Sequence, residues 1–501
     1  MAVVAAAVSA LGSASSTAQP LNFRIETSSA DFTPLHSYVA GEVGHEVMFF
    51  CGISGMGMHG VLQNGTEIGF PTTVFSDEAH LFDLETNELF SGSIGHLPDA
   101  VREALRVTNA ASVQFGHTLY IYGGYGPNLA GDDWHTRDSV TAVDLDAVRV
   151  ALRDGDPLPA SAFQVTQCDA CQVTGARIVR MGDSFVLFGG ANFAGDYGRK
   201  ATETFFEQYA IKAHIIDAAI SMTAPVETYE QTNFSPPTGI FDPLRRRDMN
   251  ALPATLPNSE GAPTPGFVIP GGVFRGGFGA WETPMSYSDG DDAIVHHTTF
   301  TQRMNQYECP AVSLYDETTG ENRFILFSGL SSHTWDGEQF VPIVGGLFNI
   351  PWTTEITQIR MEGDVFVEEL VVGAMPLPTT NADLVLNPAL PTNEHGQVLL
   401  NRLPANEVLL GRVFGGLRAA ASGVSPATFP STGIYDVYVV FGVRGDVNRD
   451  GVVNAQDLAL LLGAWGQSGD DVGLSDLNGD GVVNSQDLAI LLSYWGNNTP
   501  G

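Results

Sequence analysis

The sequence predicts a mainly β protein with a small α-helical module at its C-terminal end. Glycine accounts for 56 of the 501 residues and aromatic residues for 10%, a composition that favours short strands and tight turns over long helices. Apolar runs that stop at glycine recur along most of the chain, whereas the C-terminal end carries a duplicated pattern of Asp, Asn and Gly. The length leaves room for more than one domain, since domains typically have about 100–200 residues.

The N-terminal residues are small and apolar. Residues 2–18 consist mostly of Ala, Val and Ser and end in Ser16-Thr17-Ala18, a small-x-small sequence. This pattern predicts a secretory signal peptide over residues 1–18, and therefore a secreted, extracellular protein. Because no basic residue stands at the start of the run, a start further upstream or an Ala-rich disordered tail are the alternatives.

The charge balance is strongly acidic. The chain has 23 Lys and Arg against 57 Asp and Glu, a formal net charge of −34 at pH 7. This excess makes nucleic acids and anionic membrane surfaces poor partners. No internal apolar run reaches the about 18–20 residues of a membrane-spanning helix. Since the acids outnumber any possible ion-pair partners, we expect some of them to bind cations, with calcium as the first candidate.

From about residue 40 to 441, β-branched and aromatic runs repeatedly stop at a glycine or a glycine pair. Continuous apolar runs of this kind are typical of strands buried on both faces of a sheet. A glycine pair permits positive φ and close backbone packing where the strand leaves the sheet. The six runs are Val47–Gly52, Leu119–Gly124, Phe185–Gly190, Phe267–Gly272, Phe324–Gly329 and Leu409–Gly416.

The run Phe115-Gly116-His117-Thr118-Leu119-Tyr120-Ile121-Tyr122-Gly123-Gly124 resembles a Kelch repeat. The resemblance implies a Kelch-like β-propeller over residues 21–441, with about six blades. The glycine markers lie roughly 60–90 residues apart against about 50 in Kelch repeats, which long inserted loops would explain. Because a propeller is closed by pairing its first and last segments, we expect a strand from residues 21–50 beside Tyr435–Val440.

Four cysteines are too few for a disulfide-built scaffold in a chain of this length. Cys168 and Cys171 form the one close pair, and we expect either a local disulfide or two inert thiols there. Zinc is disfavoured because Cys51 and Cys309 stand alone, without a second pair of ligands at similar spacing.

Four residues of the long β region are candidates for ligand binding. His59 lies in a Gly-rich segment, and Trp134, Trp281 and Trp335 follow strand-ending glycines or lie in predicted loops. Aromatic rings in loops can stack on sugar rings, and packing between blades is the alternative for the tryptophans. The sequence contains no G-x-S-x-G, phosphate-loop or H-E-x-x-H motif, so it indicates no catalytic mechanism.

Two twelve-residue segments, 446–457 and 476–487, share the pattern D-x-N-x-D-G-x-x-N-x-x-D. Calcium takes six to eight oxygen ligands, which such loops supply from positions 1, 3, 5, 7, 9 and 12, with position 7 offering its carbonyl and position 9 acting through water. The sequence therefore predicts two bound Ca²⁺ ions. The expected ligands are Asp446, Asn448, Asp450, Val452, Asn454 and Asp457, and Asp476, Asn478, Asp480, Val482, Asn484 and Asp487.

A short helix is predicted after each loop. The apolar residues of each helix follow i, i+3, i+4, i+7 spacing, so we expect one stripe per helix to bury a shared core. The two stripes are Leu458, Leu461, Leu462 and Trp465, and Leu488, Leu491, Leu492 and Trp495.

These duplicated loop-helix units over residues 445–496 resemble the type I dockerin, with Asp in place of the EF-hand Glu at position 12. The resemblance implies docking onto a cohesin domain. It assigns the contact to Ala455, Gln456, Ser485 and Gln486 with the helices that follow, and the near-identity of the halves implies two binding orientations. A calcium module that stabilises or tethers the protein without a cohesin is the alternative. Residues 497–501 form a tail.

The resemblances together imply a secreted docking protein that attaches a glycan-binding or protein-binding propeller to an extracellular complex, in polysaccharide degradation. An extracellular carbohydrate-active enzyme, either a glycoside hydrolase, a lyase or an oxidase, is the alternative. A structural surface protein is the third possibility. Fold resemblance alone does not decide among them, because one fold hosts many functions.

Overall fold

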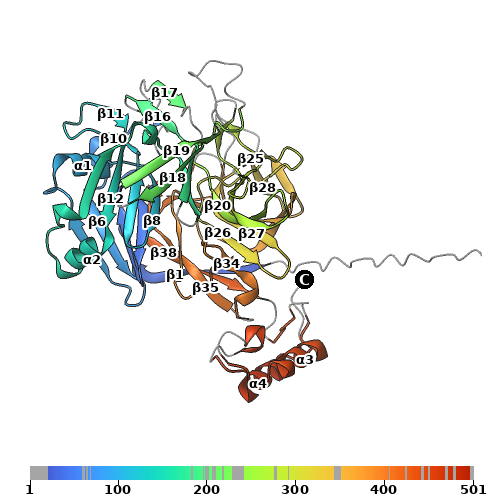
Figure 1. Cartoon of the computed structure of the whole chain (residues 1–501). Coiled ribbons are helices and arrows are strands. Elements are labelled where there is room, and N and C mark those ends of the chain that lie inside the picture. Colours follow the sequence, from blue (N-terminus) through green and yellow to red (C-terminus); the bar gives the residue numbers. More distant parts are fainter. Residues whose placement is uncertain are drawn as a thin grey trace, which may run out of the picture. The chain divides into compact units, whose positions relative to one another are not determined.

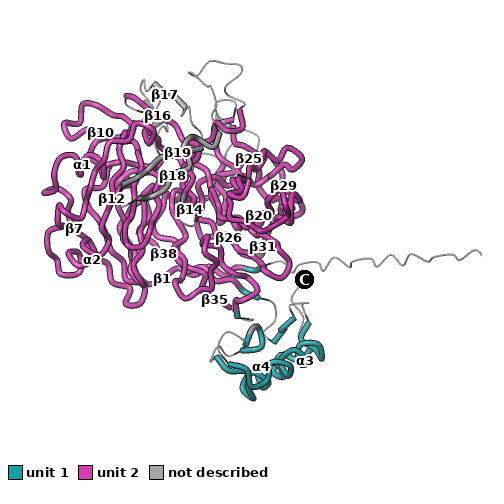
Figure 2. Tube along the Cα trace, in the orientation of Figure 1, with its two compact units in different colours: residues 1–22, 404–406, 440–501 teal, residues 23–403, 407–439 magenta. Residues whose placement is uncertain are grey.

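The computed structural model describes residues 21–58, 62–63, 66–67, 69–181, 184–195, 197, 202–205, 210–216, 219–227, 242–275, 279–291, 293–342, 351–404, 407–423, 426–441, 445–448, 452–468, 472–477 and 481–496. The chain divides into two compact units, a large unit of residues 23–403 and 407–439 and a small unit of residues 1–22, 404–406 and 440–501 (Figure 2). The predicted signal peptide over 1–18 and the tail over 497–501 lie outside the described residues.

The large unit is built from groups of four antiparallel strands, in each of which successive strands are neighbours (Figure 1). This confirms the mainly β prediction, although the described strands form many small sheets and not one closed sheet. The first two groups are β2 (Val39–Val43), β3 (Glu46–Phe50), β6 (Glu78–Asp83) and β7 (Leu89–Ser93), and β8 (Ala111–Phe115), β9 (Thr118–Tyr122), β12 (Ser139–Asp144) and β13 (Phe163–Gln167). The next two are β14 (Arg177–Met181), β15 (Ser184–Phe188), β18 (Ala210–Ile216) and β19 (Ala219–Glu227), and β20 (Leu252–Pro257), β21 (Pro263–Ile269), β24 (Met285–Ser288) and β25 (Ala293–His296).

Two further groups are joined in a nine-stranded sheet of order β33-β35-β38-β1-β31-β30-β27-β26-β34. The N-terminal strand β1 lies between β38 and β31, so the prediction of a strand from residues 21–50 beside Tyr435–Val440 is confirmed. The strands are β26 (Ala311–Asp316), β27 (Glu321–Leu330), β30 (Trp352–Glu362), β31 (Val365–Ala374), β33 (Leu384–Leu386), β34 (Val398–Leu399), β35 (Glu407–Phe414), β38 (Gly433–Val440) and β1 (Asn22–Asp31).

Shorter elements connect these groups. In the large unit the described helices are α1 (Asp99–Leu105) and α2 (Leu145–Asp154), with 3₁₀ turns at Thr72–Val74, Ala160–Ala162, Asp169–Cys171 and Leu400–Arg402. The short strands are β4 (Leu62–Gln63), β5 (Thr66–Glu67), β10 (Tyr125–Pro127), β11 (Trp134–Thr136), β16 (Ala191–Ala194), β17 (Thr202–Phe205), β22 (Val273–Arg275), β23 (Gly279–Ala280), β28 (His333–Trp335), β29 (Phe340–Pro342), β32 (Thr379–Thr380), β36 (Leu417–Ala419) and β37 (Thr428–Pro430).

The glycine pairs that end the second strand of a group link neighbouring groups. Gly123 and Gly124 have φ of 59° and 85°, and a Cβ on Gly123 would lie 2.1 Å from the carbonyl oxygen of Val173. Only glycine fits so close to a backbone at positive φ, as we expected from the sequence. The backbone N–H groups that donate to the next group are those of Gly52 to Val107 (2.8 Å), Gly124 to Val173 (2.8 Å), Gly190 to Arg246 (2.8 Å) and, from the last group back to the first, Gly416 to Leu35 (2.9 Å).

One residue just before the first strand of each group has a left-handed backbone conformation. We call these six residues, with φ between 48° and 68°, the left-handed turns: Ser37, Asn109, Gly175, Asp248, Glu308 and Asn381. Backbone N–H to carbonyl hydrogen bonds join them in one series: Asp248 to Gly175 (2.8 Å), Gly175 to Asn109 (2.9 Å), Asn109 to Ser37 (3.3 Å), Ser37 to Asn381 (3.0 Å) and Asn381 to Glu308 (2.8 Å). The series thus contains one turn from each of the six strand groups.

Of the two alternatives for the close cysteine pair, a local disulfide or two inert thiols, the structure has the disulfide. Cys168 and Cys171 form a disulfide, whereas Cys51 and Cys309 are free and buried. The local disulfide closes the 3₁₀ turn between β13 and β14.

The small unit contains α3 (Ala455–Gly463), α4 (Ser485–Ser493) and a 3₁₀ turn at Gly473–Ser475. Its buried core differs from the predicted stripes. Leu461 and Leu491 are buried, but Leu462, Leu492, Trp465 and Trp495 are exposed. Both helices end before the tryptophans, and core space is taken by Val447, Val453, Leu477 and Val483 of the loops. The expectation that the whole stripe packs inward was therefore wrong.

Candidate functional site

The closing aspartates of the two loops are buried at the starts of α3 and α4, each with 0% exposure. Asp457 Oδ1 accepts the N–H of Asn448 (3.0 Å) and its Oδ2 that of Asn454 (2.8 Å). Asp487 accepts the N–H of Leu477 (2.7 Å) and that of Asn484 (2.7 Å) in the same way. Each carboxylate therefore ties the start of its loop to the start of its helix.

Asn454 and Asn484 cap the two helices. The Oδ1 of Asn454 accepts the N–H of Gln456 (2.8 Å), and Asn484 does the same with Gln486 (2.7 Å). The aspartate three residues later completes a capping box in both cases. These asparagines, which we expected to reach calcium through water, thus have a structural role of their own.

The described oxygens of the loops fit calcium. Asp446 and Asp476, at position 1, are 2% and 6% exposed, so each loop buries two carboxylates. Burying a carboxylate is costly unless hydrogen bonds or a cation compensate it, and carboxylate, amide and carbonyl oxygens are the ligands calcium prefers. Asp450, Asn478 and Asp480 lie outside the described residues, and within those residues no three His, Cys, Asp or Glu side chains could hold a metal.

The two halves expose matching side chains. The predicted partner contacts Ala455, Gln456, Ser485 and Gln486 are all exposed in the first turns of α3 and α4. Apolar residues thirty positions apart have nearly equal exposure: Val452 and Val482 at 37% and 39%, Leu462 and Leu492 at 52% and 53%, and Trp465 and Trp495 at 45% each.

Residues 444–495 match the dockerin type I domain family. The match spans both loops and both helices of the dockerin module, and supports calcium binding by it. It does not extend into the large unit. A search of curated proteins found no match to the chain. None of the helices in the described part of the chain combines the length and apolar character needed to cross a membrane.

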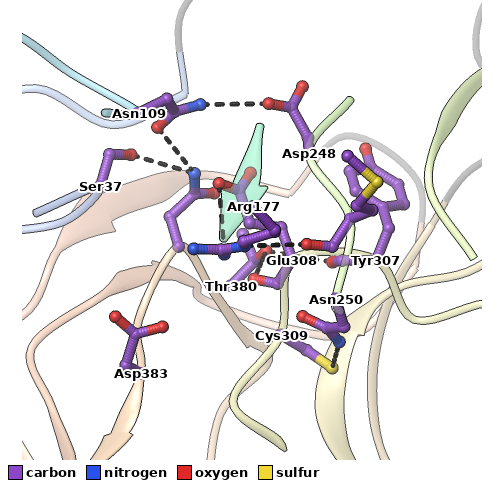
Figure 3. Close-up of polar contacts among 12 residues, drawn as sticks. Ser37, Asn109, Arg177, Asp248, Asn250, Tyr307, Glu308, Cys309, Thr380 and Asp383 are labelled. Carbon is purple, nitrogen blue, oxygen red and sulfur yellow. Dashed lines mark hydrogen bonds and ion pairs between the residues drawn. The ribbon is translucent and has the colours of Figure 1, made fainter. Parts of the chain in front are cut away.

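The left-handed turns of the large unit gather buried and half-buried polar side chains (Figure 3). Asn109 Nδ2 donates to Asp248 Oδ1 (3.2 Å), and Asn381 Nδ2 donates to Ser37 Oγ (3.0 Å). Glu308 Oε1 lies 3.7 Å from an Arg177 nitrogen. A cavity of about 10 Å³ beside them has room for about one water molecule.

The acidic side chains of this cluster resist ionisation. Burial raises the pKa of Glu308 to about 8, and the neighbouring charge of Asp248 adds to the effect while Arg177 opposes it. Burial also raises the pKa of Asp248, against the opposing charges of Arg247 and Arg177. Both shifts favour the protonated forms of these carboxyl groups.

Sequence reasoning missed this cluster because its members lie in six different strand groups. A signal was present nonetheless, since Ser37, Asn109, Gly175, Asp248 and Asn381 are small or short polar residues placed before strands. Gly, Asn and Asp are the residues that adopt the left-handed conformation most readily. Glu308 follows no such preference, and nothing in the sequence singles it out.

The four predicted ligand residues have different surroundings. His59 lies outside the described residues, and Trp134 of β11 is half-buried. Trp281 is 3% exposed and its Nε1 donates to the Arg245 carbonyl (3.0 Å), so packing occupies its ring. Trp335 of β28 is half-buried and lines an open depression of about 430 Å³ together with Phe300, Phe340 and Glu368.

Proposed function

We propose that this protein acts outside the cell as a calcium-dependent docking protein in polysaccharide degradation. Its dockerin module would bind a cohesin domain, and its large unit would bind a glycan or protein ligand. The observation that carries the proposal is the equal exposure of Trp465 and Trp495 at corresponding positions of the two halves. Exposed tryptophans are costly in a module this small, and they are enriched at the centres of protein interfaces.

Two calcium ions are part of this proposal. Both loops bury the carboxylates of positions 1 and 12, and both helices begin with the same capping box. Because the loops are alike in these described features, an ion that fits one loop fits the other. Two ions would order the helices on which the exposed side chains stand.

The large unit would be a six-bladed Kelch-like β-propeller. Six strand groups, the bond from Gly416 back to Leu35, and the position of β1 beside β38 support a ring that returns to its start. In a propeller, loops collect on two faces around a centre, where ligands bind. The left-handed turns would then line that centre.

An extracellular carbohydrate-active enzyme is the second candidate. The observation that favours it is Glu368, whose pKa burial raises to about 7, beside the depression that Trp335 lines. A carboxyl group that titrates near neutral pH is suited to general acid catalysis. Release of reducing sugar from polysaccharides would favour this enzyme over a binding protein.

The docking proposal is tested by capture of the full chain on immobilised type I cohesin domains, with calcium and with chelator. We expect capture by at least one cohesin, loss of capture in chelator, and loss in the variant Asp457→Ala/Asp487→Ala. Asp154→Ala, which removes an exposed carboxylate at the end of α2, is the matched control and should be captured normally. Capture that persists in chelator, or no capture by a broad cohesin panel, would overturn the proposal.

A further inference from the structure

The depression beside Trp335 has an aromatic wall with fixed geometry. Trp335 and Phe340 face each other across the hairpin of β28 and β29, with ring centroids 5.0 Å apart and planes at 69°. The backbone N–H of Trp335 and the Thr334 hydroxyl both donate to Glu355 Oε1, at 3.3 Å and 3.0 Å. The hairpin is therefore anchored to β30, and the Trp335 side chain is only partly buried.

The turn of the same hairpin presents polar groups at the rim. Asp336 Oδ1 accepts the N–H groups of Glu338 (2.9 Å) and Gln339 (2.9 Å), which fixes the turn. The exposed side chains of Glu338 and Gln339 line the depression. They offer acceptors and, from the Gln339 amide, donors.

The opposite side is formed by the segment before β26 and by β31. Phe300 stacks on Phe366, with centroids 5.5 Å apart and planes at 27°. The two carboxylate oxygens of Glu368 accept the N–H groups of Arg303 (2.6 Å) and Met304 (2.8 Å). Glu368 is thereby held in place, and the exposed guanidinium of Arg303 adds a donor-only group to the lining.

We propose that this depression binds a pyranose ring of a neutral polysaccharide, stacked on the face of Trp335 beside Phe340 and hydrogen-bonded by Arg303, Glu338 and Glu368. The proposal rests on the ligand-binding role proposed above for the large unit, and names the ligand class. Sugar C–H groups are positively polarised and suit the negative face of an aromatic ring. Hydroxyl groups both donate and accept, so one polyol can use the guanidinium, the carboxylates and the amide together.

The charges in the depression favour a neutral sugar. Arg303 brings one positive charge, against the carboxylates of Glu338 and Glu368. An acidic sugar would meet the carboxylate of Glu338 and, above pH of about 7, that of Glu368, against one guanidinium in a chain whose net charge is −34. Repulsion of this kind raises the cost of binding a polyanion such as polygalacturonate.

The test is retention of the full chain on insoluble cellulose, xylan and mannan, with polygalacturonate as the acidic comparison. We expect at least one neutral polysaccharide to retain the protein, equally with and without chelator. Trp335→Ala should lower retention at least about tenfold, whereas Trp335→Phe keeps an aromatic face and should bind within about threefold of the wild type. Phe429→Ala removes an aromatic ring that is 38% exposed and does not line the depression, and should be retained normally.

Cohesin capture by the same variants separates this inference from the docking proposal. Trp335→Ala should be captured by cohesin as well as the wild type, which shows that its dockerin module is folded and loaded with calcium. Circular dichroism and a thermal unfolding midpoint equal to those of the wild type show that the large unit of the variant is folded. If cohesin does not capture the wild type but polysaccharide retains it, the docking proposal fails and the sugar-binding inference stands. Normal retention of Trp335→Ala, retention by polygalacturonate only, or no retention of the wild type by any neutral polysaccharide would overturn the inference.

Discussion

The backbone N–H of Ser37 donates a 3.0 Å hydrogen bond to the carbonyl of Asn381, and the Asn381 side-chain amide donates to Ser37 Oγ, also at 3.0 Å. The two residues are 344 positions apart and precede the first strands of the first and last strand groups. Nearby, Phe49 of the first group packs on Phe414 of the last, with centroids 5.1 Å apart. Backbone and apolar contacts thus join the two ends of the large unit.

The N-terminal strand should contribute strongly to the stability of the large unit. Phe23 of β1 is 5% exposed and packs edge-on against Phe327 of β27, with centroids 5.3 Å apart. Phe23→Ala should lower the free energy of unfolding by about 3–5 kcal/mol, measured by chemical denaturation. Phe429→Ala, at a 38% exposed position, should cost less than about 1 kcal/mol. Equal effects of the two variants would contradict a strong contribution of β1 to stability.

Substitutions at two glycines distinguish the cost of a strained backbone from the cost of a steric clash with a neighbouring strand group. Gly123 and Gly116 have φ of 59° and 56°, but only at Gly123 would a Cβ meet a neighbour, the Val173 carbonyl at 2.1 Å. Gly116→Ala should cost about 1 kcal/mol for the left-handed conformation alone. Gly123→Ala should cost at least about 2 kcal/mol more, because adjacent groups must move apart. Thermal unfolding of the two variants measures the difference, and equal melting temperatures would argue against direct contact between the groups.

The free energy of unfolding should decrease as the pH rises, because of Glu308. Its pKa is raised to about 8 in the folded protein, against about 4.3 when unfolded, so folding retains a proton. Its contribution to stability is complete below the unfolded pKa and is lost as pH rises toward about 8. Glu308→Gln should flatten this dependence and exceed the wild type in stability at pH 9. The exposed Glu78→Gln serves as the control and should follow the wild type at every pH.

Removal of calcium should affect the dockerin module alone. Without the ion, the buried carboxylates of each loop lose the cation proposed to neutralise them, so α3 and α4 should lose amide-exchange protection in chelator. Strands of the large unit should keep their protection. Hydrogen-exchange mass spectrometry of the full chain reads both units at once, and unchanged protection of α3 and α4 would mean that calcium does not order them.

Features set by local chemistry could be predicted from the sequence. The spacing of acids in the two loops follows from calcium coordination, and the glycine pairs follow from positive φ next to a neighbouring backbone, as at Gly123. The position of β1 beside β38 was expected from the resemblance to a propeller, in which the first and last segments pair. For the loops and the glycine pairs, a short stretch of residues carries the physical requirement.

Features set by distant packing could not be predicted. Asp248 and Glu308 acquire their raised pKa values only when separate strand groups meet. Trp281 and Trp335 look alike in sequence, yet one is enclosed and the other lines an open depression. Trp465 and Trp495 continue a helical spacing, but the helices end at Gly463 and Ser493 and both rings stay exposed. Burial of an aromatic residue depends on neighbours that a periodic pattern does not specify.

The most direct test of docking by two equivalent halves is calorimetric titration of a captured cohesin into the wild type and three variants in calcium. The variants are Leu462→Ala/Trp465→Ala in the first half, Leu492→Ala/Trp495→Ala in the second, and all four substitutions together. Either half alone should bind within about threefold of the wild type, because the other half still offers its face, and the fourfold variant should lose at least about a hundredfold in affinity. Full affinity in the fourfold variant would contradict the account.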